Sequence, residues 1–174
     1  IGTTIKWVED NIGMLSHGTI TMEVFEPGVL SKYDEILPKV SDGDFEAGFG
    51  FAGYSESLIP ALVLFGAFPF GPEPNEYLAW MWEGNGMQLW QQLYDNAGYN
   101  VKVLVCGVIT GESGGWFNRE INTIADFNGL KMRTFGMTAE VLEKFGAIPV
   151  PLSGSQAYLA LKDGTIDGAE FSTP

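Results

Sequence analysis

The chain has 174 residues, of which 45% are hydrophobic, so it can bury a core and form one domain or two small ones. It carries 22 acidic and 9 basic residues, and the net charge of −13 argues against binding to nucleic acid or an anionic membrane, because both rely on lysine and arginine. The single cysteine, Cys106, excludes an internal disulfide and a multi-cysteine metal site.

Hydrophobic periodicity and turn residues predict alternating helices and strands. The predicted helices cover residues 2–16, 32–40, 74–96, 138–145 and 155–162, with Pro38 disturbing the second and Gly84 and Gly86 weakening the third. The predicted strands cover residues 19–25, 44–51, 101–110, 130–134, 147–152 and 165–171, with a short turn at 124–127. This succession predicts an α/β fold with mainly parallel sheets, flanked by helices, and with ligands beyond the carboxyl ends of the strands.

A composition change near Thr110 predicts two lobes. Residues 1–108 would form a partial lobe I, residues 109–170 lobe II, and residues 171–174 the start of a return crossing. Because a helical pattern is already under way at the first residue and a strand stops at the last, we expect an internal piece of a longer protein, incomplete at both ends. The longest apolar run, 58–70, is interrupted by prolines and a glycine, so no membrane span is expected.

Arg133 is the leading candidate for a ligand-binding residue. It ends the apolar segment 130–134, directly after the turn residues Asn128 and Gly129. Basic residues are scarce in this acidic chain, so a cation in an apolar strand is expected to have a specific carboxylate partner, and that partner could be a ligand.

Acidic and aromatic residues supply further candidates. Glu112, Asp167 and Glu170 lie in or beyond strand ends near the lobe junction and could bind a hard cation through oxygen, although solvated carboxylates are the simpler interpretation. Phe68 and Phe70 flank a proline in a loop that cannot bury both rings as a helix face would, so this loop could wall an apolar pocket.

One motif indicates an enzyme. The sequence GESGG at 111–115 matches GxSxG, which exposes a nucleophilic serine on a sharp turn between a strand and a helix. A serine hydrolase acting through Ser113 is therefore the alternative function. It requires a helix directly after Gly115 and a later histidine, whereas residues 116–120 lead into a turn and the single histidine, His17, comes earlier.

Two weaker patterns favour structural interpretations. The sequence GFGFAG at 48–53 matches the GxGxxG of dinucleotide sites, but its flanks favour a glycine-rich loop between lobes. Cys106 and His17 could form a thiol–imidazole pair, but Cys106 follows three apolar residues and is better explained as a small buried hydrophobe. His17, beside Gly18, fits a helix end.

Five motifs occur in the order typical of one family. They are YDEIL at 33–37, FPFG at 68–71, GGWFNREI at 114–121, GLKMR at 129–133 and DGTIDGAEF at 163–171. Over nearly its whole length the chain resembles the solute-binding proteins of tripartite ATP-independent periplasmic (TRAP) transporters, in the branch that binds 2-oxo acids and related carboxylates. The resemblance implies a two-lobed periplasmic-binding-protein-like fold, a receptor rather than an enzyme, a periplasmic location, and a signal peptide in the full-length precursor.

The resemblance also implies the site and its partners. Arg133 would pair bidentately with a substrate carboxylate, and Glu112, Glu170 and Phe171 would hold a sodium or calcium ion that bridges protein and ligand. Phe70 and Phe171 are expected to contact the substrate as well. The implied partners are a small organic acid, the TRAP membrane subunits and, in the full-length protein, a possible second copy.

The chain departs from the family pattern at two of these positions. Glu112 replaces the usual glutamine, and Phe171 replaces the usual tryptophan. The added carboxylate favours a divalent cation or a different ligand, because it brings a further negative charge to a site meant for an anion.

Overall fold

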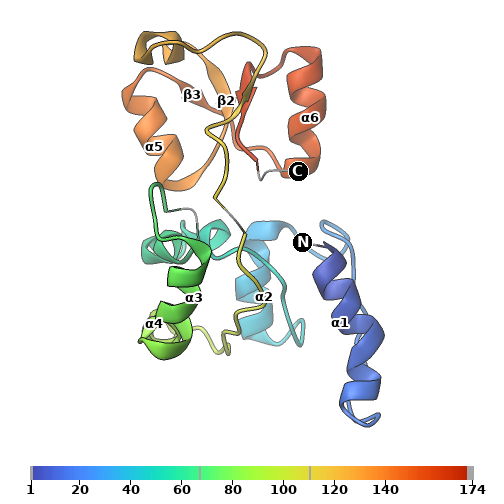
Figure 1. The fold of residues 1–174 in the computed structure, drawn as a ribbon. Helices are drawn as coiled ribbons and strands as arrows, with labels where there is room; N and C mark the ends of the chain where they lie inside the picture. The colour runs from blue at the N-terminus through green and yellow to red at the C-terminus, as the bar shows by residue number, and fades with distance from the viewer. Residues whose placement is uncertain (1, 67, 110, 172–174) are drawn as a thin grey trace.

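The computed structural model describes residues 2–66, 68–109 and 111–171, and Figure 1 shows that they form two halves. The helices are α1 (Gly2–Leu15), α2 (Ile36–Asp42), α3 (Pro74–Glu83), α4 (Gly86–Asn96), α5 (Gly136–Lys144) and α6 (Gly154–Asp163). The strands are β1 (Trp116–Phe117), β2 (Lys131–Arg133), β3 (Ile148–Pro149) and β4 (Gly168–Ala169). The short 3-10 helices are η1 (Tyr33–Glu35), η2 (Ala52–Ser55), η3 (Pro60–Phe65) and η4 (Ile124–Phe127). No helix within these described ranges has the length and apolar character needed to cross a bilayer.

One half is built on a mixed sheet with the strand order β1-β4-β2-β3. β2 pairs in parallel with both β3 and β4, so that Met132 lies opposite Pro149 on one side and Gly168 on the other. β1 pairs antiparallel with β4 at the edge. The sheet lies between α5 and α6 (Figure 1), which confirms the predicted α/β class; the edge strand β1 was not predicted.

The core of this half comes from alternate residues of the strands. Leu130, Met132 and Ile166 are completely buried. Two alanines of α6, Ala157 and Ala160, pack against the β4 side of the sheet. Small side chains at this contact let the helix approach the strands closely, which keeps the strand ends in a fixed arrangement.

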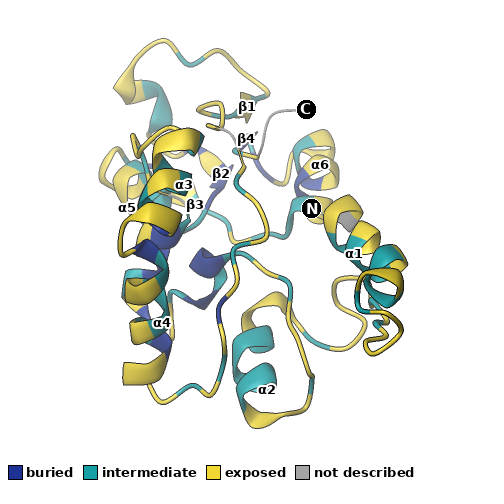
Figure 2. Cartoon of the chain, turned by 60° about the horizontal axis from the view of Figure 1, so that its bottom comes forward, coloured by how far each residue is buried: buried dark blue, intermediate teal, exposed yellow. Residues whose placement is uncertain are grey.

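The other half is helical. Its core joins Leu62 of η3, Met81 of α3, Tyr94 of α4 and Val103. Figure 2 shows buried residues on the inner sides of α3 and α4, whereas α1 has no buried residue between positions 3 and 15. Pro38 is tolerated in α2 because it lies in the first turn, where its missing N–H has no intrahelical acceptor.

The single helix predicted at 74–96 is wrong: the chain forms α3 and α4, separated at Gly84. The Gly84 amide donates to the carbonyls of Ala79 and Trp80, both at 3.2 Å. A Cβ at Gly84 would lie 2.7 Å from the Trp80 carbonyl oxygen, and one at Gly86 would lie 2.7 Å from the Met81 sulfur. The glycines therefore permit a close turn between the helices, where a larger residue would collide.

Three segments predicted as strands do not form strands within the described residues: 19–25, 44–51 and 101–109. The end of the third prediction, Thr110, lies outside those residues. The Val103 amide is bound by a side chain, that of Gln91 at 3.0 Å, rather than by a neighbouring strand. A strand requires a partner main chain, and none of the described segments supplies one here. The prediction that Cys106 is buried is also wrong, because Cys106 is exposed and the neighbouring Leu104 is 71% exposed.

Candidate functional site

Arg133 is the last residue of β2, an interior strand, and is 3% exposed. Its Nε donates to the carbonyl of Leu152 at 3.0 Å, while Nη1 donates to the carbonyl of Glu170 at 2.6 Å and to its Oε2 at 3.0 Å. Leu152 follows β3 and Glu170 follows β4, so the parallel strands bring these groups together at their carboxyl ends. Both N–H groups of Nη2 have no acceptor among the described residues.

Two phenylalanines enclose the guanidinium. The Arg133 Cζ lies 5.0 Å from the centroid of the Phe135 ring and 5.4 Å from that of Phe171, within the range of a cation–π attraction. The Phe171 ring in turn lies against Gly154, the first residue of α6, where a Cβ would collide with it. These contacts restrict the guanidinium plane and so limit the directions in which Nη2 can donate.

Two carboxylates share the field of Arg133. Burial raises the pKa of Glu170, the positive charge of Arg133 lowers it, and the negative charge of Glu112 raises it. Burial also raises the pKa of Glu112, and Arg133 opposes that rise. When both carboxylates are ionised, this group of three side chains carries one net negative charge.

Thr134 places a hydroxyl beside this group. Its side chain is among the completely buried ones, and its Oγ1 lacks a hydrogen-bond partner within the described residues. The hydroxyl lies near enough to Glu170 to lower the pKa of that carboxyl slightly, yet it is outside hydrogen-bond geometry. A buried hydroxyl without a partner is costly, so a bound group at this position would offset the cost.

The oxygens of Glu112, Glu170 and Thr134 are of the type that sodium and calcium prefer. No three side chains from His, Cys, Asp and Glu converge on one point in residues 2–66, 68–109 and 111–171. The chemistry of the donors thus fits a hard cation, but the protein carboxylates would supply two of its ligands. Main-chain oxygens and a bound acid would have to complete the shell.

Two predicted site residues lie elsewhere. Phe70 is fully exposed, with a backbone φ of 57°, so the structure does not bring it into the group around Arg133. Asp167 accepts a hydrogen bond from the Lys131 amide at 2.9 Å through its carboxylate. This bond helps to hold β2 beside β4, which gives Asp167 a structural role.

The hydrolase interpretation is wrong. After Gly115 the chain enters the strand β1 rather than the helix that a nucleophile elbow requires. Ser113 is exposed, and His17 lies in the turn after α1, in the other half. The conditions for a serine–histidine pair are not met in the described chain.

The GxGxxG pattern serves packing. A Cβ at Gly48 would collide with Ile36 of α2, and one at Gly53 would lie 2.7 Å from the Phe51 ring. Space that a phosphate would need is therefore filled by the protein's own side chains. The structure supports the interpretation of a glycine-rich loop.

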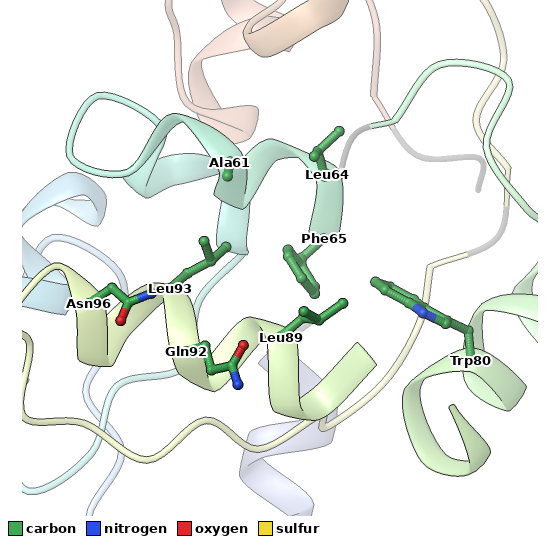
Figure 3. A pocket seen from close by; sticks show the side chains of 8 residues that line it. All are labelled: Ala61, Leu64, Phe65, Trp80, Leu89, Gln92, Leu93 and Asn96. Atoms are coloured by element: carbon green, nitrogen blue, oxygen red, sulfur yellow. The ribbon is translucent and has the colours of Figure 1, made fainter. Parts of the chain in front are cut away.

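Two apolar cavities lie apart from Nη2. The larger, of about 280 Å³, is lined by Ala61, Leu64, Phe65, Trp80, Leu89, Gln92, Leu93 and Asn96 (Figure 3). In Figure 3 the side chains of Phe65, Leu89 and Trp80 face one another, and no charged residue lines the space. The second, of about 190 Å³, lies behind Phe171, between α6 and the edge of the sheet. Neither offers a cation to an organic acid.

Sequence reasoning missed Thr134, Phe135 and the carbonyl of Leu152. Thr134 and Phe135 directly follow Arg133, so their proximity to it could have been inferred from their place at a strand end. A carbonyl acceptor is common to every residue, so the sequence carries no signal for Leu152.

Comparison with known proteins identifies the family. The sequence model described as "Bacterial extracellular solute-binding protein, family 7" matches residues 2–174. A monocarboxylate 2-oxoacid-binding periplasmic protein of Nostoc sp. is 32% identical over 100% of this chain and 48% of its own length. The chain thus spans about half the length of this relative.

Solved structures agree with that assignment. A TRAP transporter solute-binding protein from Bordetella bronchiseptica, described with calcium and picolinate in one site of a dimer, has a TM-score of 0.92 and 32% identity over 100% of this chain and 51% of its own. One from Colwellia psychrerythraea, with bound calcium and pyruvate, has a TM-score of 0.83 and 30% identity over 99% of this chain and 52% of its own. The chain belongs to family 7 of the bacterial extracellular solute-binding proteins, which confirms its resemblance to the TRAP solute receptors.

Proposed function

We propose that the full-length protein is the periplasmic receptor of a TRAP transporter and binds a small organic acid, a 2-oxo acid or a related carboxylate. The observation that carries this proposal is that Arg133 is buried and oriented but, within the described residues, has hydrogen-bond donors left over. Its guanidinium is buried, oriented by two phenylalanines, and retains two N–H donors on Nη2 for which residues 2–66, 68–109 and 111–171 supply no acceptor. A carboxylate is a suitable acceptor for such a charged donor, because a charge-assisted hydrogen bond is stronger than one between neutral groups.

The binding geometry follows from the occupied donors. Because Nη1 already donates twice to Glu170, an acid that forms two parallel bonds across Nη1 and Nη2 must share Nη1 with Glu170 or displace its carboxylate. An acid held by Nη2 alone would leave the ion pair intact. We favour the second arrangement, since displacement would leave the Glu170 charge buried without its partner.

A bridging cation resolves the charge balance. Arg133, Glu112 and Glu170 together carry one net negative charge, so a bound monocarboxylate would raise the total to two. A divalent cation held by Glu112, Glu170 and the main chain near Phe171 would bring the total to zero, whereas sodium would leave one negative charge. Related proteins have been described with calcium and picolinate, calcium and pyruvate, and sodium and pyruvate. The glutamate at position 112 therefore favours calcium.

Transport would follow from closure of the two halves over the acid. Residues 1–108 would move as one lobe and residues 109–170 as the other, and the closed receptor would dock on the membrane subunits. The crossing predicted at 171–174 lies outside the described residues beyond Phe171. A homodimer of the full-length protein is a further part of this proposal, supported by the dimer in the Bordetella bronchiseptica relative.

The experiment is calorimetric titration of the full-length protein with pyruvate and with picolinate, in calcium, in sodium and in chelator. Binding that requires an acid and a cation together supports the proposal. Arg133→Lys is the matched variant, because it keeps the positive charge but loses the planar fork, and it should weaken binding at least tenfold. No heat with either acid in any buffer would reject the carboxylate class.

A further inference from the structure

The guanidinium of Arg133 is linked by edge-to-face and tilted aromatic contacts to the opposite half of the molecule. Phe135, which lies over Arg133, precedes α5 in the sheet half. Its ring centroid is 5.7 Å from that of Tyr54 and 6.0 Å from that of Phe51. Tyr54 belongs to η2 and Phe51 immediately precedes it, in the helical half. Figure 1 shows the 3-10 helices of that half facing the sheet half.

The position of Phe51 is tightly determined. A Cβ at Gly53 would lie 2.7 Å from the Phe51 ring, and a Cβ at Gly66 would collide with the same ring. The Phe51 and Tyr54 rings are 5.5 Å apart and nearly perpendicular, at 74°. Two glycines thus hold Phe51 in place, and Phe51 in turn supports Tyr54.

The hydroxyl of Tyr54 has an unused donor. It forms no hydrogen bond with any described residue, whereas the hydroxyl of Tyr77 donates to the Phe65 carbonyl at 2.9 Å. Burial raises the pKa of Tyr54, and the charges of Arg133, Glu170 and Glu112 also act on it. The hydroxyl therefore lies in the field of the same three side chains that form the proposed acid site.

We propose that Tyr54 is a ligand-binding residue contributed by the helical half, and that its hydroxyl donates a hydrogen bond to the acid held by Arg133. Because Phe51, Tyr54 and Phe135 connect the two halves, closure of the halves would then directly change the position of the Tyr54 hydroxyl at the acid site. This inference rests on the proposed function, because the acceptor is an oxygen of the bound acid. It adds a contact from the half that does not contain Arg133, as a receptor that closes on its ligand requires.

The test compares Tyr54→Phe with Tyr77→Phe in the full-length protein. Each variant removes one hydroxyl and keeps the ring, so both should fold. The probes are pyruvate and picolinate, titrated by calorimetry in calcium. Tyr54→Phe should raise Kd by roughly tenfold to a hundredfold, the range for a lost hydrogen bond to a charged group, while Tyr77→Phe should leave Kd within about twofold.

The outcomes separate the two proposals. An unchanged Kd in Tyr54→Phe, or an equal rise in both variants, would overturn the role of Tyr54 while Arg133→Lys still tests the receptor. If the unmodified protein binds neither acid, the proposed carboxylate class fails, and the role of Tyr54 fails with it. A rise confined to Tyr54→Phe supports the contact.

Discussion

The carboxylate of Glu170 accepts a hydrogen bond from Nη1 of Arg133 at 3.0 Å, and the side chains of the pair are 13% and 3% exposed. A buried ion pair of this kind contributes little net stability, because desolvation offsets most of the attraction. Its value here is geometric. The pair fixes the guanidinium through Nη1 and leaves Nη2 for a ligand.

Arg133→Ala should destabilise the fold by about 3–5 kcal/mol, because it leaves the Glu170 charge buried and unpaired. The double variant Arg133→Ala, Glu170→Gln should recover part of this loss, since it removes the orphaned charge. Denaturant unfolding of both variants measures the difference. Equal stabilities for the single and double variants would contradict the account of Glu170 as the principal partner of Arg133.

Glu112→Gln should weaken the binding of pyruvate in calcium by roughly tenfold, equivalent to about 1.4 kcal/mol, because one negative charge leaves the cation site. Binding in sodium should change less, since a monovalent ion needs less charge compensation. Titrations in the two salts provide the comparison. A parallel loss in both salts would argue that Glu112 does not select the cation.

Gly154→Ala should reduce ligand affinity without loss of fold. Alanine is favoured over glycine in a helix by up to about 1 kcal/mol, but its Cβ would push the Phe171 ring away from Arg133. The exposed side of Phe171 gives the ring room to move, so the strain should be released there. Thermal unfolding and calorimetric titration with pyruvate, measured on the same sample, separate the effect on stability from the effect on affinity. An affinity equal to that of the parent would show that Phe171 does not position the guanidinium.

Glu56→Gln should alter how stability depends on pH. Burial raises the pKa of Glu56, and the negative charge of Glu140 on α5 raises it further. A carboxyl whose pKa is raised in the folded state binds its proton more tightly when the protein is folded. It therefore destabilises the fold once the pH exceeds its unfolded pKa of about 4.3. This destabilisation grows until the pH reaches the raised pKa of the folded state. The variant should be more stable than the parent at neutral pH, and this advantage should vanish below about pH 4. Unfolding midpoints across pH 3–8 test it, with Glu140→Gln expected to give a smaller gain in the same direction.

Sequence reasoning succeeded where structure depends on local pattern. The strand cores at 131–133, 148–149 and 168–169 and the helices α5 and α6 were predicted because apolar spacing and turn residues mark them within a few positions. Arg133 was singled out for a related reason, as a scarce cation at the end of an apolar strand, and its role in ligand binding stays a prediction. Glu170 was predicted as a cation ligand, from the resemblance and from its place at the end of a strand, and its ion pair with Arg133 was not predicted.

The failures share a physical origin in contacts distant along the chain. Residues 101–109 have the composition of a buried strand, but a strand forms only when another main chain lies beside it. Phe70 was expected to line a pocket, yet the direction of a loop side chain depends on backbone angles that composition does not specify. Tyr54 escaped notice because it reaches Phe135 across 81 positions of sequence, a separation at which periodicity carries no information.

The main chain of residues 105–109 forms no hydrogen bond with any other described residue, and its sequence, VCGVI, is apolar and uncharged. Such a segment is a template on which a foreign strand can assemble. Preparations of these 174 residues alone should therefore self-associate through this edge as concentration rises. The unpaired amides and carbonyls of residues 105–109, which explain why the predicted strand is absent, should therefore be detected first as self-association rather than as a change in ligand affinity.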